Sequence, residues 1–166
     1  DLGNRQGSMH LYEEWSTEGG GAVISVGEAF WFHLINSYCD EPPNVDVAMS
    51  LLDRAIKESA TVSRKSTPPR TFNVVIQACA QARRPALALE VLRRMRDFGV
   101  SPTSITYLFV LRSCESATQI ERPRGVGEDS AANIPKSLLN VAREDGVKPT
   151  PKMLSSLLLS RTRSPD

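Results

Sequence analysis

The sequence lacks long apolar runs and has few cysteines and few aromatic residues. Apolar stretches such as Ala22–Val26 and Leu157–Leu159 fall far short of the roughly 20 residues that a membrane helix needs, so we expect no direct membrane insertion. The three cysteines, Cys39, Cys79 and Cys114, are too few and too odd in number for a secreted disulfide framework, which favours a reducing compartment. We interpret Cys79 and Cys114 as small core residues.

Motifs for catalysis and metal binding are also missing. The chain contains no glycine-rich phosphate loop, no nucleophile motif and no carboxylate pair at catalytic spacing. It has only two histidines, and a metal cluster of His10 with Glu13 and Glu14 is the weaker reading of that segment. We therefore predict a protein that is not an enzyme and that uses no cofactor and no metal.

Charge is nearly balanced but unevenly distributed. The 20 basic and 19 acidic residues give a net charge of +1. Residues 1–28 contain five acidic residues and one arginine, a net charge of −4, whereas residues 70–124 contain nine arginines and four acidic residues, a net charge of +5. The balance does not predict a strong nucleic-acid binder, but the distribution predicts a central basic patch.

Two amphipathic helices are predicted between Thr71 and Thr103. The first shows apolar residues at the i, i+3, i+4, i+7 spacing of one helix face, namely Phe72, Val75, Ile76 and Cys79. The second has its own stripe of Leu87, Ala88, Val91, Leu92 and Met95. Pro85 suits the first turn of the second helix, and Gly99 followed by Pro102 suits its end. The unit is a helix–turn–helix.

The same design recurs along the chain. Thr106-Tyr-Leu lies 35 residues after Thr71-Phe-Asn, and Asp145-Gly-Val-Lys-Pro echoes Asp97-Phe-Gly-Val-Ser-Pro. We predict an all-α fold, an α-solenoid of about three helix–turn–helix repeats plus a trailing helix. Residues 1–27 form an irregular N-terminal extension with a remnant helix at Leu11–Trp15, and residues 28–166 form the solenoid. Its units are 28–68, 69–103, 104–150 and a partial 151–163, with insertions at Ser59–Thr67 and Ser116–Ser130 that read as loops.

A period of 35, an aromatic–Asn start and a Gly-hydrophobic-x-Pro finish together resemble the pentatricopeptide repeat family. Residues 70–107 carry the resemblance most closely. It implies an α-solenoid that is mostly organellar (mitochondrion or plastid) and that binds single-stranded RNA or serves as a scaffold in organellar assemblies. It also implies that two residues per unit select a base, one after the aromatic and one after the closing proline.

These pairs are mostly degenerate here. The central unit offers Asn73 with Thr103, and Asn73 either reads a base edge or bonds local backbone. The other units offer no second polar pair: Phe32 with Pro68, Leu108 with Thr150, and Ser155 with no visible partner. The resemblance also implies an apolar residue that packs beside the bound base. This chain has Arg70 and Lys152 at two of these positions, and only Ile105 is apolar there.

Five arginines form the rest of the candidate site. Arg83 and Arg84 lie in the predicted inter-helix turn, and Arg93, Arg94 and Arg96 lie on the second helix, which the resemblance places on the convex side. They either grip RNA phosphates or an acidic protein surface, or they form a solvated helix face. The absence of lysine in this stretch favours contact, because arginine makes forked phosphate contacts.

Three functional hypotheses follow. The first is a non-catalytic scaffold of an organellar ribonucleoprotein such as a mitochondrial or plastid ribosome, with RNA and protein subunits as partners. The second is a single-stranded RNA-binding processing or stability factor, and the third is a protein-binding accessory subunit of an organellar membrane complex. Because a short stack with Leu154 and Leu158 near its end would leave an apolar edge, we also expect the isolated chain to be marginally stable or to aggregate.

Overall fold

The computed structural model describes residues 28–40, 42–62, 67–117 and 128–162, together with residues 7, 9, 10 and 14. Every element of the four longer stretches is a helix, which confirms the predicted all-α fold. The elements are α2 (Glu28–Cys39), α3 (Val45–Val62), α4 (Pro69–Gln81), α5 (Pro85–Asp97), α6 (Ser104–Ala117), α7 (Glu128–Glu144) and α8 (Pro151–Thr162).

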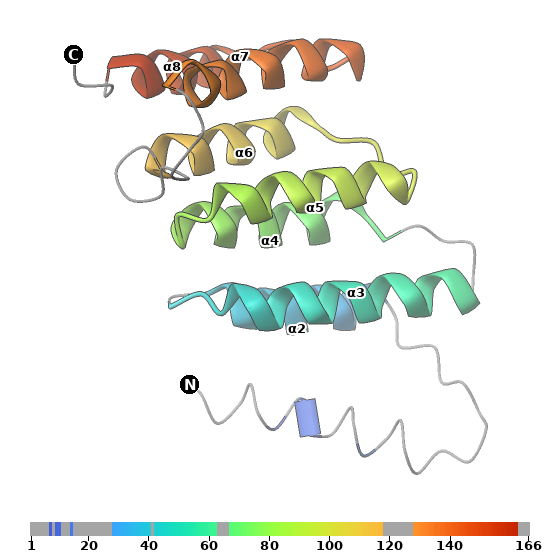
Figure 1. Ribbon diagram of the computed structural model, residues 1–166. Helices are drawn as coiled ribbons and strands as arrows, with labels where there is room; N and C mark the ends of the chain where they lie inside the picture. Colours follow the sequence, from blue (N-terminus) through green and yellow to red (C-terminus); the bar gives the residue numbers. More distant parts are fainter. Residues whose placement is uncertain are drawn as a thin grey trace.

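The helices stack in layers, with α2 and α3 at one end and α7 and α8 at the other (Figure 1). The helices α2, α4, α6 and α8 pack on one another in succession, and we call them the first-helix row. The helices α3, α5 and α7 each pack on the preceding first helix, and we call them the second-helix row. Within the described stretches no two helices of the second-helix row pack directly on each other. The first-helix row is therefore the continuous spine of the stack.

Local sequence sets the ends of α5 as predicted. Pro85 occupies the first turn, where its missing N–H costs no hydrogen bond. Gly99 adopts the left-handed conformation (φ +69°), and the N–H of Val100 donates to the carbonyl of Met95 at 2.9 Å. Val100 is buried against the helix that it closes. This is the glycine C-cap that the Gly-Val-Ser-Pro segment indicated.

Two other helix ends are also capped by residues of the local sequence. Gly146 (φ +75°) closes α7, with the N–H of Val147 donating to the carbonyl of Ala142 at 2.8 Å. Asn44 caps α3 through its Oδ1, which accepts the N–H of Val47 at 3.2 Å. After α4 the left-handed position holds Arg83 (φ +56°) in place of glycine. A side chain with a Cβ is strained there by about 1–2 kcal/mol.

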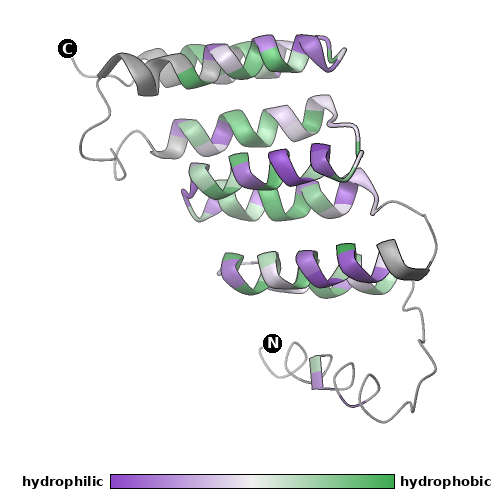
Figure 2. Ribbon diagram, turned by 45° about the vertical axis from the view of Figure 1, so that its right-hand side comes forward, coloured by the Kyte–Doolittle hydropathy of each residue, from purple (hydrophilic) through white to green (hydrophobic). Residues whose placement is uncertain are grey.

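The core repeats with a period of 35 residues. The buried residues of α4 recur at the matching places of α6: Thr71, Phe72, Val75, Ile76 and Ala78 correspond to Thr106, Tyr107, Val110, Leu111 and Ser113. Hydrophobic and hydrophilic segments alternate along each helix, as amphipathic packing requires (Figure 2). Each fully buried large side chain contributes about 1.5–3 kcal/mol, so the repeated stripe holds the pairs together.

Helices extend into both segments that we predicted as loops, and α3 continues to Val62, inside the segment Ser59–Thr67. α6 continues to Ala117 and α7 begins at Glu128, so both helices extend into the segment Ser116–Ser130 that we predicted as a loop. Its middle, residues 118–127, lies outside the described residues, as do residues 63–66 of the other insertion and most of 1–27, including the predicted helix at Leu11–Trp15 apart from Glu14.

All three cysteines are free thiols, and Cys79 is fully buried. Burial raises the pKa of Cys79 and of Cys114 to about 11. Their interpretation as core residues is confirmed. Of the described helices, none combines the length and apolar character required to cross a membrane.

Candidate nucleic-acid interface

Asn73 lies half-buried on α4, at the contact between α4 and α6. Its Oδ1 accepts a hydrogen bond from the hydroxyl of Thr106 at 2.7 Å. Thr106 in turn accepts the backbone N–H of Thr103 at 3.0 Å, and the Thr103 hydroxyl accepts the backbone N–H of Thr106 at 3.3 Å. Thr103 is thus the N-cap of α6, and a reciprocal capping pair links it to Asn73.

This network fixes how the Asn73 amide is presented. Because an amide oxygen only accepts, the Thr106 hydroxyl donates its one hydrogen to the Oδ1 of Asn73, and its oxygen accepts the N–H and the hydroxyl hydrogen of Thr103. The two Nδ2 donors of Asn73 have no partner among the described residues. The predicted pair of Asn73 and Thr103 is therefore brought together, through Thr106, and the amide is left with donors for a ligand.

The hydrogen-bond network around Thr106 is absent at the equivalent position of α4. Thr71 corresponds to Thr106, and its buried hydroxyl has no hydrogen-bond partner among the described residues. The two hydrogen-bond partners of Thr106 have no counterparts there. Phe32 occupies the position equivalent to Asn73, and Pro68, which has no N–H, occupies the position equivalent to Thr103. The degenerate pair of Phe32 and Pro68 therefore also leaves a polar group unsatisfied in the core.

Arg70 is held by the first helix of the preceding pair. Its guanidinium forms an ion pair with Glu28, and its Cζ lies 4.8 Å from the centroid of the Phe32 ring. Such a cation–aromatic contact contributes about 0.5–1 kcal/mol at an exposed site. Ile105, the apolar residue at the equivalent place of α6, is 53% exposed. A planar cation and an apolar side chain thus occupy matching positions on either side of Asn73 in the first-helix row.

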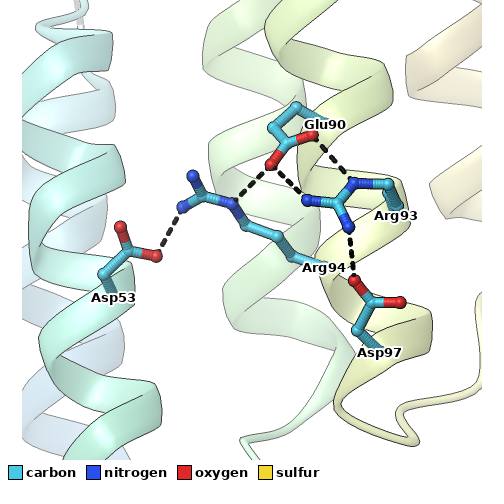
Figure 3. Close-up of polar contacts among 5 residues, drawn as sticks. All are labelled: Asp53, Glu90, Arg93, Arg94 and Asp97. Carbon is cyan, nitrogen blue, oxygen red and sulfur yellow. Dashed lines mark hydrogen bonds and ion pairs between the residues drawn. The ribbon is translucent and has the colours of Figure 1, made fainter.

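The arginines of α5 are paired with the protein's own carboxylates. Arg93 bonds to Glu90 and to Asp97, each at 2.8 Å, and Arg94 bonds to Glu90 at 3.0 Å (Figure 3). Arg94 also reaches across to Asp53 on α3, which places an ion pair between two helices that do not pack directly. The hydrogen bond from Arg93, followed by that from Arg94, lowers the pKa of Glu90 to about 2.

Arg96 links α5 to the following helix pair. It donates to Asp145 at 2.6 Å and to the hydroxyl of the buried Tyr107 at 2.7 Å, and that hydroxyl also bonds to Asp145. Burial, and then the hydrogen bond to Asp145, raise the pKa of Tyr107 above its ordinary value. These bonds join α5 to α6 and to the residue that follows α7.

The two turn arginines differ from each other. Arg84 pairs with Asp46 on α3 at 2.8 Å. Arg83 is exposed and has no ion-pair partner in the described part of the chain. The four arginines Arg84, Arg93, Arg94 and Arg96 therefore meet five carboxylates, Asp46, Asp53, Glu90, Asp97 and Asp145. The charge of these four arginines is balanced within the protein, and phosphate contact by the five candidate arginines stays a prediction.

Two observations bear on what sequence reasoning missed. Thr106, the residue that orients Asn73, was not among the predicted site residues, although its spacing of three from the cap Thr103 is the spacing of a capping box. His10 lies 3.6 Å from Glu14, and the described residues contain no group of three or more potential metal ligands; Glu13, the third member of the metal reading, lies outside the described residues.

Comparison with known families identifies one match. Residues 70–115, which span α4, α5 and most of α6, match the model of the PPR repeat family. A comparison with curated proteins gave no match. The match covers Asn73, Thr103 and Thr106, and with them the whole network that holds the amide. The resemblance seen in the sequence is confirmed over this stretch, because residues 70–115 match the PPR repeat family.

Proposed function

We propose that this protein is a non-catalytic scaffold subunit of an organellar ribonucleoprotein, such as a mitochondrial or plastid ribosome, and that it contacts RNA without reading its sequence. The observation that carries the proposal lies in the first-helix row. Of the equivalent positions Phe32, Asn73, Leu108 and Ser155, only Asn73 presents an amide that is oriented by a hydrogen-bond network.

One oriented amide is not enough for sequence-specific recognition. A good bidentate contact to a base discriminates by about 1–3 kcal/mol, and specificity accumulates over several such contacts. Phe32 and Leu108 offer only stacking or apolar contact, which every base accepts equally. The same surface still suits a single strand whose backbone is held elsewhere in an assembly, which is the situation of a scaffold subunit.

The arginine pairing favours a second candidate, a protein-binding accessory subunit of an organellar membrane complex. Because Arg84, Arg93, Arg94 and Arg96 are already matched by carboxylates, the second-helix row offers little unpaired positive charge to a polyanion. The hypothesis of a processing factor that selects single-stranded targets receives no comparable support, since it requires more units with intact base-selecting pairs.

The test is UV crosslinking with RNA sequencing on the native protein. We expect crosslinks on structured RNA of one assembly, reduced by Asn73→Ala and unchanged by Arg93→Ala, which removes an arginine that is paired within α5. Leu108→Asn, which places a second amide one unit further on, is expected to increase crosslinking. Crosslinks on short messenger targets would support the processing factor, and no crosslinked RNA would support the protein-binding subunit.

A further inference from the structure

The boundary between the first layer, α2 and α3, and the second layer, α4 and α5, lacks a hydrogen bond that the next boundary has. Between α4 and α6 the hydroxyl of Thr106 donates to Asn73. The equivalent hydroxyl at the first boundary, that of Thr71, has no partner among the described residues. On its inner side this boundary is held by the packing of α2 on α4 and by the exposed ion pair of Arg70 and Glu28.

On the outer side of the same boundary, direct helix packing does not set the separation of α3 and α5. These two helices of the second-helix row do not pack on each other within the described stretches. α3 packs on α2 and α4, and α5 packs on α4 and α6. Figure 3 shows the side chain of Arg94 reaching from α5 to Asp53 on α3. The contacts between α3 and α5 are therefore made by long charged side chains.

Two ion pairs join α3 to α5, and we call them the outer ion pairs. Asp46, in the first turn of α3, pairs at 2.8 Å with Arg84, the N-cap residue of α5. Asp53 pairs with Arg94, which lies in the last turn of α5. Asp46 and Asp53 are about two turns apart, or about 10 Å along the axis of α3. Contacts at two separate points oppose both widening and sliding of the two helices.

The two outer ion pairs differ in how strongly salt screens them. The side chain of Asp46 is 77% exposed and that of Arg84 is 42% exposed, whereas that of Arg94 is 26% exposed. The screening length falls from about 10 Å at 0.1 M salt to about 3 Å at 1 M, and exposed pairs are affected most. Arg94 is also held by Glu90 at 3.0 Å. As salt rises, the pair of Arg84 and Asp46 should therefore separate first, while Arg94 acts as the pivot.

We propose that the outer ion pairs are a salt-sensitive strap that sets the separation of α3 and α5, so that the first two layers move apart on their outer side as ionic strength rises. The packing of α2 on α4 persists, because apolar burial does not depend on charge. Exposed ion pairs contribute little to the free energy of unfolding, so the movement is a change of tilt between two folded layers. That tilt alters how Arg70 lies against Glu28 and against the ring of Phe32.

The test is the distance between two spin labels on the full chain, measured by double electron–electron resonance. The labels are attached to p-acetylphenylalanine in place of Ser50 on α3 and of Ala86 on α5, so that the native thiols stay unlabelled. Both positions are exposed, and they lie within about one turn of Asp46 and Arg84. Between about 0.05 M and about 1 M NaCl we expect the distance to increase by about 3 Å, the width of one water inserted into a separated ion pair.

The salt response of the parent chain tests the proposal without any substitution in the strap, and two variants test its cause. Asp46→Asn combined with Asp53→Asn should give the longer distance already at low salt, with no further response to salt. Asp97→Asn is the matched control, because it removes an ion pair with Arg93 inside α5 and none between layers. It should keep the distance and the salt response of the parent.

Circular dichroism separates a change of tilt from a loss of fold. The three carboxylates that are replaced are each at least 45% exposed, so all variants should keep the helix content of the parent at both salt concentrations. The proposal is overturned if the distance in the parent does not change with salt, or if the double variant keeps the distance of the parent. It is also overturned if Asp97→Asn shifts the distance as much as the double variant does.

Discussion

Two buried threonines at equivalent places of the fold are expected to change stability in opposite directions when each is replaced by valine. Thr71 and Thr106 occupy equivalent places of α4 and α6, and both are at most 1% exposed. Thr106 accepts the N–H of Thr103 and donates to Asn73, whereas the hydroxyl of Thr71 has no partner among the described residues. Valine keeps the shape of the side chain and removes only the hydrogen bonding.

The expected magnitudes follow from the number of bonds lost. Thr106→Val removes three hydrogen bonds, to the N–H of Thr103, to the hydroxyl of Thr103 and to Asn73, worth about 0.5–1.5 kcal/mol each, so the free energy of unfolding should fall by about 3 kcal/mol. In a chain of this length that lowers Tm by about 9 °C. Thr71→Val removes an unsatisfied buried hydroxyl and should stabilise by about 1 kcal/mol, which raises Tm by about 3 °C.

Thermal and urea denaturation monitored by circular dichroism measures both variants. The reasoning is refuted if Thr71→Val destabilises the chain as much as Thr106→Val does. Phe32→Asn provides the matched test, because it places an amide where Asn73 stands in the next unit. In that background the hydroxyl of Thr71 gains a partner, and Thr71→Val should then lower stability.

Three further predictions concern the turn, the α5 network and the thiols. Arg83→Gly should raise the free energy of unfolding by about 0.5–1 kcal/mol, because glycine adopts the positive φ of this position without strain, and a drop in Tm would contradict that explanation. Because the folded pKa of Glu90 is about 2, below its usual value of about 4.3, its contribution to stability is present above pH 5 and is lost as the pH falls toward 2. Denaturation curves of the parent and of Glu90→Gln should therefore differ at pH 7 and converge near pH 2, and a constant difference would show that the carboxylate is not held by Arg93. Burial raises the pKa of Cys39 to about 12 and that of Cys79 to about 11, so both thiols should resist iodoacetamide at pH 8 until denaturant unfolds the chain, and rapid labelling of the native protein would contradict the packing described.

The expected marginal stability of the isolated chain has a structural counterpart. The predicted apolar edge is present at Leu154 and Leu158, while Leu157 packs partly against the core.

The sequence alone determined the helices, their period and the two ends of α5. Pro85 and Gly99 act within one turn of the chain, and the apolar spacing of α4 and α5 is a property of single helices, so both could be predicted locally. The pairing of Arg93 with Glu90 and Asp97 was also present in the sequence as i, i+3 and i, i+4 spacings, although a count of net charge conceals it.

Only the tertiary structure decided which distant groups meet. Arg84, Arg94 and Arg96 bond to carboxylates 38 to 49 residues away, and Asn73 bonds to Thr106 across 33 residues. Those meetings depend on how one helix pair is offset against the next, which the inter-helix turns and the packing of the first-helix row set together. Four of the five candidate arginines are part of internal ion pairs for this reason, because charge is counted along the chain but is neutralised across the stack.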